Sequence, residues 1–215
     1  MKRMRAMLAA VLVLLAGSAR ADVGVTLKAG TLGLGADLTL PVVPDLNFRA
    51  GYNGAALSRD IELNEAECEG KIRWSTIPIF LDWHPGGSDF RLSGGAVINN
   101  NRVTLSAAPT QTFTLDGVDY SITEMEGKIT FDRLAWYIGI GGGNALAEGR
   151  IHVAFDLGVM FQGTPEAEAT ATASVPAFQP YLDADLQKEL NDFQKDDLDS
   201  FTMYPVLSVG FSLHF

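Results

Sequence analysis

Residues 150–162, RIHVAFDLGVMFQ, carry an apolar side chain at every odd position from 151 to 161. These apolar residues are Ile151, Val153, Phe155, Leu157, Val159 and Phe161. The even positions include His152, Asp156, Gly158 and Gln162. Because successive side chains of a β-strand point to opposite faces, the stretch predicts a strand with one apolar face and one polar face.

The same alternation recurs along the chain, in residues 46–53, 90–99 and 203–215. Short connections fall at 41–45, 84–89 and 142–149, whereas long polar connections fall at 58–70, 101–128 and 163–202. Transmembrane β-barrels combine short periplasmic turns with long external loops in this way. We therefore predict an all-β fold, an eight-stranded antiparallel transmembrane β-barrel.

The first 21 residues predict a cleaved signal peptide. They combine basic residues near the start, a short apolar run at 8–17 and the small-x-small sequence Ala19-Arg20-Ala21, so we expect the barrel to comprise residues 22–215. Removing residues 1–21 leaves 12 basic against 26 acidic residues, a formal charge of −14. Nucleic acid is not an expected partner, because phosphate binding needs a basic face. The single cysteine, Cys68, cannot form an internal disulfide.

The short connections allow the strand register to be predicted. If each hairpin closes tightly, Leu40 faces Leu46, Trp83 faces Phe90 and Gly141 faces Arg150. The same counting places two opposite-charge pairs on the polar face, Asp37 with Arg49 and Asp82 with Arg91.

The number of strands depends on a change of phase near Gly30-Thr31. Apolar residues occupy odd positions from 23 to 29 and even positions from 32 to 40. A tight reversal there gives eight strands, one of them short. A bulge gives the same change without a turn, and the eighth strand would then lie in a long loop. The alternation also changes phase near Ser75 and near Arg133, and at these two positions we expect bulges and not turns.

The polar face of an eight-stranded barrel points into a lumen that side chains can fill. The network expected in this lumen consists of Asp37, Arg49, Asp82, Arg91, Arg150, His152 and Asp156, with Lys71 and Arg73 also facing inward. Buried charges must be paired, so the network favours a structural plug.

Three alternatives remain open. In the first, His152 and Asp156 act with Ser208 or Ser212 as the nucleophile of a lipid acyl hydrolase or transferase. The second is a narrow channel for small solutes, and the third is a soluble exported barrel with its apolar face inward. The spacing of the three histidines fits no metal site, and we expect no metal and no cofactor.

One segment has helical periodicity. Leu182, Leu186, Leu190 and Phe193 recur at helical spacing after Pro180, which suits a first turn. This pattern predicts one short amphipathic helix in the last external loop, and we expect it to pack over the barrel mouth.

The final run, SVGFSLHF, resembles the C-terminal assembly signal of bacterial outer-membrane barrels at Ser208, Gly210, Leu213 and Phe215. Together with TLGLGADLT, LDWHP, FRLSGG, YIGIGGGNA and FDLGVMFQGTP, it resembles a family of small proteobacterial outer-membrane proteins, broadly similar to OmpW and the OmpA membrane domain. The resemblance implies a fold and a membrane but no reaction. We accordingly expect a monomer in the bacterial outer membrane, with both termini periplasmic and the long loops extracellular. Its expected partners are outer-membrane lipid and lipopolysaccharide, and the barrel assembly machinery during biogenesis.

Overall fold

The computed structural model describes residues 22–63, 66–107, 111–115, 117–198 and 200–215, so the predicted signal peptide lies outside the described residues. The strands in these ranges are β1 (Gly24–Gly30), β2 (Gly33–Val43), β3 (Leu46–Leu63), β4 (Ala66–Trp83), β5 (Phe90–Asn99), β6 (Arg102–Ala107), β7 (Gln111–Leu115), β8 (Val118–Thr130), β9 (Leu134–Gly142), β10 (Ile151–Phe161), β11 (Glu166–Ala173) and β12 (Met203–His214). The helical elements are η1 (Pro85–Gly87), η2 (Pro176–Phe178), α2 (Gln179–Phe193) and η3 (Gln194–Leu198). Among the described residues, no helix combines the length and the apolar character needed to cross a membrane.

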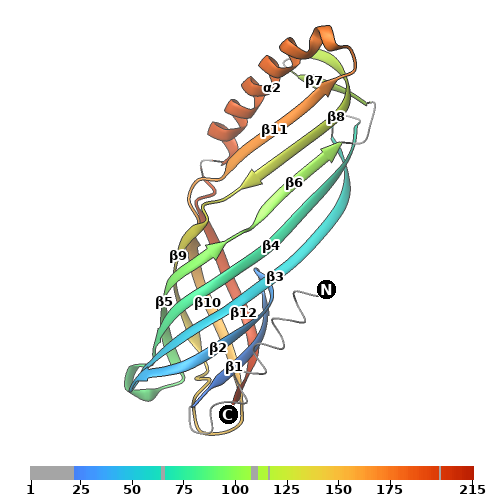
Figure 1. Cartoon of the computed structure of the whole chain (residues 1–215). Coiled ribbons are helices and arrows are strands. Elements are labelled where there is room, and N and C mark those ends of the chain that lie inside the picture. Colours follow the sequence, from blue (N-terminus) through green and yellow to red (C-terminus); the bar gives the residue numbers. More distant parts are fainter. Residues whose placement is uncertain (1–21, 64–65, 108–110, 116, 199) are drawn as a thin grey trace.

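Eight of the described strands close into an antiparallel barrel, which confirms the predicted fold. Around the barrel they follow the order β1, β2, β3, β4, β5, β9, β10 and β12, and β12 pairs back onto β1 (Figure 1). The phase change near Gly30 is a tight turn, because Gly30 pairs with Gly33 across Thr31 and Leu32. Gly33 has a φ of 94°, a conformation that favours glycine. The bulge alternative for this stretch is therefore wrong.

The predicted register is wrong in all three hairpins, but each error is an even number of residues. Leu40 pairs with Phe48, Trp83 with Leu92, and Gly141 with Asp156. In the first hairpin the pairing shifts between Pro41 and Val43 and continues to Val43–Leu46, so the turn consists only of Pro44 and Asp45, with Asp45 at a φ of 64°. The second turn is wider than assumed, because the connection includes η1. An even shift keeps every side chain on its predicted face, whereas a shift by one residue would have reversed the faces.

The long polar connections are mostly strands rather than loops. Beyond the barrel, β4 pairs with β6, β6 with β8 and β8 with β11, and β7 adds to β8 (Figure 1). These strands form an extended sheet that rises from one side of the barrel wall. Around Ser75 the register of β3 and β4 is unchanged, so the bulge predicted there is absent from this pairing. Near Arg133 the strand is interrupted, because β8 ends at Thr130 and β9 begins at Leu134.

The predicted helix is present as α2, but it packs on the extended sheet and not over the barrel mouth. Leu182 and Leu186 are buried, and Leu182 joins an apolar cluster on the inner face of the sheet. The other members of the cluster are Cys68, Phe113, Tyr120, Ile122 and Ala173. Gln179 donates to the carbonyl of Ala171 at 2.8 Å, and its side-chain oxygen accepts from the amide of Ala173 at 2.8 Å. The helix thus satisfies part of the free edge of β11, which would otherwise expose unpaired backbone groups.

Candidate functional site: the charged lumen

Arg49 lies at the centre of the barrel lumen and contacts three carboxylates. It donates through Nε to Asp82 at 2.6 Å and through Nη2 to the second Asp82 oxygen at 3.0 Å. It also donates to Asp37 and to Asp156, each at 3.2 Å. Arg49 is on β3, whereas Asp156 is on β10, so this contact crosses the lumen between strands that are not neighbours in the barrel.

Two more cations complete the network. Lys28 lies 2.6 Å from Asp37, and Arg91 lies 2.7 Å from Asp156. The side chains of all six residues are at most 9 % exposed. Three cations therefore meet three carboxylates, which is the balance that buried charges need to offset their desolvation.

Serines and a glycine support the carboxylates. Ser93 donates to Asp82 at 2.6 Å, and Ser208 donates to Asp156 at 3.1 Å. A Cβ at Gly51 would overlap the Asp37 carboxylate, so the network depends on the missing side chain at this position. Small residues on the inner face are thus part of the site, because they leave room for the long charged side chains.

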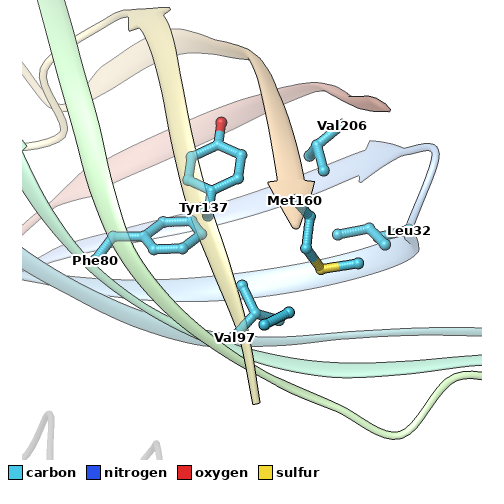
Figure 2. Packing of buried hydrophobic residues seen from close by; sticks show 7 residues of the cluster. Leu32, Phe80, Val97, Tyr137, Met160 and Val206 are labelled. Atoms are coloured by element: carbon cyan, nitrogen blue, oxygen red, sulfur yellow. The ribbon is translucent and has the colours of Figure 1, made fainter. Parts of the chain in front are cut away.

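An apolar plug lies next to the network, on the side of the extended sheet. Its buried members are Leu32, Phe80, Val97, Ala135, Tyr137, Met160 and Val206 (Figure 2). The rings of Phe80 and Tyr137 stack with their centroids 4.4 Å apart, and the Arg49 guanidinium lies 5.1 Å from the centre of the Phe80 ring. The network and the plug are therefore in direct contact.

The other side of the network is closed by the connection between β9 and β10, residues 143–150. The carbonyl of Gly143 accepts from Arg91 at 2.6 Å, and Ala145 is buried. Asn47 donates to Asn144 at 3.3 Å, and His214 Nδ1 lies 3.0 Å from the Ala147 carbonyl oxygen. This connection folds against the hairpin end of the lumen.

The space left between the network and the plug is small. A cavity of about 20 Å³ is lined by Lys28, Asp156, Ser208, Tyr137 and Met160, among others. A volume of this size holds about one water molecule. The network and the plug can therefore hold strands together and block passage, and the cavity between them is too small for a lipid or a sugar.

The structure brings five of the seven predicted network residues together, namely Asp37, Arg49, Asp82, Arg91 and Asp156. Arg150 is exposed in the connection after β9 and lies outside the network. His152 Nε2 lies 3.2 Å from the Gly149 carbonyl oxygen, and no hydrogen bond among the described residues joins it to Asp156, Ser208 or Ser212. These contacts do not assemble the hypothetical acyl-transfer site.

Two further residues expected in the lumen are elsewhere. Lys71 and Arg73 are exposed on the outer face of the extended sheet, because the bulge assumed at Ser75 is absent. Trp74, the next residue along β4, points inward in place of Lys71 and Arg73. It packs against the plug, and its Nε1 donates to the Tyr204 hydroxyl at 3.3 Å.

Lys28 and Tyr137 also belong to the site, although neither was predicted from the sequence. The apolar residues at odd positions 23–29 place Lys28 on the opposite face, and this signal could have identified it. For Tyr137, the signal is the glycines around it, because Cβ atoms at Gly139 and Gly158 would overlap its hydroxyl group.

The residues of the predicted C-terminal signal lie on β12 or directly after it. Ser208 points into the lumen and Gly210 is buried, whereas Leu213 and Phe215 are exposed on the outer face. The backbone amide of Phe215 donates to the carbonyl of Val23 at 3.0 Å, which extends the pairing that closes the barrel.

No protein-family model matches the sequence, and a search of curated proteins gave no match. Among solved structures, the chain is similar to CarO2 of Acinetobacter baumannii, with a TM-score of 0.57 and 19 % identity over 91 % of this chain and 99 % of that one. It is also similar to CarO of the same organism, with a TM-score of 0.55 and 18 % identity over 89 % and 97 % of the two chains. The chain therefore shares the fold of these outer-membrane β-barrel proteins.

Proposed function

We propose that this chain is a bacterial outer-membrane β-barrel with a closed lumen and a structural or interaction role. The observation that carries the proposal is the filling of the lumen, in which the three-cation, three-carboxylate network lies directly against the apolar plug. A wide pore needs a continuous path of water, and an eight-stranded barrel is narrow enough for side chains to remove it.

The outer surface of the barrel supports a membrane location. It exposes large apolar side chains on neighbouring strands, including Trp136, Ile138, Val153, Phe155, Val209 and Phe211. Soluble monomers rarely expose contiguous apolar patches of more than a few hundred Å². A soluble barrel with its apolar face inward would have the opposite arrangement from the one observed, in which the charged network lies inside and large apolar side chains cover the outside.

The proposed orientation follows from the shape of the barrel. The start of β1, the end of β12 and the hairpins after β2 and β4 lie at one end, which we assign to the periplasm (Figure 1). The extended sheet and α2 lie at the other end and would be extracellular. We also propose that the barrel is a monomer, with lipopolysaccharide and the assembly machinery as partners.

We expect the purified barrel to give only small, rare currents in a planar lipid bilayer, because the plug and the network interrupt the water path. Single-channel recording measures this, with an open sixteen-stranded porin reconstituted under the same conditions as the positive control. Large, steady currents from this chain would contradict a closed lumen and favour the narrow-channel alternative.

Orientation can be tested by cysteine labelling of intact cells. A membrane-impermeant maleimide should label a Val118→Cys variant, since Val118 is 49 % exposed at the turn between β7 and β8. A Ser88→Cys variant, altered in the connection between β4 and β5, should react only after the cells are permeabilised. The native thiol gives little background, because Cys68 is buried and burial raises its pKa. The reverse labelling pattern would invert the orientation.

A further inference from the structure

The outer face of the extended sheet carries a basic cluster, formed by Lys71, Arg73, Arg102 and Lys128. Arg73 on β4 pairs directly with Arg102 on β6, and Thr104 on β6 pairs with Lys71 on one side and with Lys128 on the other. The alternate residues of the same strands, such as Cys68 and Leu105, pack in the inner cluster under α2. The four basic side chains therefore share the opposite, outward face.

The cluster has little compensating charge within the protein. Lys128 lies 3.6 Å from Glu168, but no salt bridge among the described residues joins Lys71, Arg73 or Arg102 to a carboxylate. Like charges directly opposite each other on neighbouring strands are destabilising. An Arg73–Arg102 pair in a chain with a strong excess of acidic residues therefore points to an external anion.

The height of the cluster on the barrel indicates where this anion lies. From the hairpin end upward, the outward residues of β4 are apolar at Trp83, Leu81, Ile79 and Ile77, then polar at Ser75, and basic from Arg73. The ten residue steps from Trp83 to Arg73 rise by about 25 Å at ~3.3 Å per step and a tilt of ~40°, which matches the height of the apolar band of outer-membrane barrels. Arg73 and Arg102 thus lie at the upper boundary of the apolar surface.

The sign of the charge changes again farther from the barrel. The next outward row carries Asp60, Glu69 and Glu126, all exposed. Along β4 the outer face therefore changes from apolar to basic and then to acidic with increasing distance from the barrel, whereas β11 at the edge of the sheet carries Glu166 and Glu168 in the two basic rows. This order complements a lipid leaflet, in which a layer of headgroup phosphates borders the hydrocarbon.

We propose that the basic cluster binds the headgroup phosphates of lipopolysaccharide in the outer leaflet, at its lipid A portion. Paired guanidinium groups suit this ligand, because each can donate two parallel hydrogen bonds to a phosphate. The acyl chains of the same lipid would lie along the apolar residues directly below the cluster. The inference rests on the proposed outer-membrane orientation and names a specific lipid site within it.

The test is a titration of the folded barrel with bisphosphorylated lipid A in mixed micelles. The Arg73→Gln/Arg102→Gln variant should bind lipid A about tenfold more weakly than the unaltered protein, since it loses two charge-assisted contacts. The matched control is Arg150→Gln/Lys195→Gln, which removes the same charge from two exposed residues elsewhere and should bind within about twofold of the unaltered protein. Fully dephosphorylated lipid A should bind the unaltered protein as weakly as lipid A binds the Arg73→Gln/Arg102→Gln variant.

Three results would overturn the proposal. These are unchanged binding by the Arg73→Gln/Arg102→Gln variant, an equal loss in the control, or equal binding of dephosphorylated lipid A by the unaltered protein. The comparison of the two lipids uses only the unaltered protein, so it decides the question even if a variant does not fold. The conductance and labelling results do not depend on this site, so failure of the lipid site is distinguishable from failure of the proposed function.

Discussion

Replacing Arg49 with methionine is expected to lower the free energy of unfolding of the barrel by about 3–5 kcal/mol. The substitution keeps a long side chain but removes the cation, which leaves the carboxylates of Asp37, Asp82 and Asp156 with only Lys28 and Arg91. A buried charge without its partner retains its desolvation cost, and this cost is the main source of the loss. Guanidinium unfolding in lipid vesicles, followed by tryptophan fluorescence, measures the change.

The control is Arg150→Met, the same substitution at an exposed arginine, which should change stability by no more than about 0.5 kcal/mol. Adding Asp82→Asn and Asp156→Asn to the Arg49→Met variant should recover part of the lost stability, because these changes remove two of the uncompensated charges. If Arg49→Met equals the unaltered protein, or if the combined variant is less stable still, Arg49 does not hold the network together by charge.

Replacing Phe215 with alanine is expected to reduce strongly the amount of folded barrel in the outer membrane of cells. We propose that the last residues act as an assembly signal, so the effect should arise during insertion. Phe211→Ala is a matched control, since Phe211 and Phe215 lie on the same face and are both 63 % exposed. Each substitution should cost a similar stability, about 1–3 kcal/mol, by removing one lipid-facing aromatic side chain.

The two measurements are the membrane level in cells and refolding into detergent in vitro. We expect Phe215→Ala to fail in cells but to refold nearly as well as Phe211→Ala, which should be tolerated in both. If the two variants behave alike in cells, Phe215 is only another outward aromatic residue and the proposed signal is wrong.

Alternation with a period of two was sufficient to assign the faces of the barrel strands. It placed Asp37, Arg49, Asp82, Arg91 and Asp156 on the inner face, and all five are buried there. This assignment holds although the predicted hairpin register was wrong by two residues in the β2–β3 and β4–β5 hairpins and by six in the β9–β10 hairpin. Parity depends only on the strand itself, because each peptide unit reverses the side-chain direction, whereas register depends on the conformation of each turn.

The same reasoning failed where amphipathic contrast is weak. The strands of the extended sheet alternate small, polar and charged residues, as in EAEATATA of β11, so their sequence reads as a polar loop. Their pairing becomes favourable only because β4 continues past the barrel and offers its edge to β6, and because α2 then covers the inner face. Lys71 and Arg73 were assigned to the wrong face for a related reason, since a change of phase near Ser75 looks like a bulge when the partner strand is not known.

The sequence by itself therefore determined the strand type, the two faces of the barrel strands within the barrel and the helix after β11, because these depend on the period of the pattern along a few neighbouring residues. Only the tertiary structure decided that Arg49 on β3 meets Asp156 on β10, and that a plug around Phe80 and Tyr137 lies against them. Closing the sheet brings strands together that are far apart in the chain, and the positions of their side chains across the lumen depend on the register of every hairpin between them. No local pattern carries that information, because it is set by the combined pairing of all eight strands.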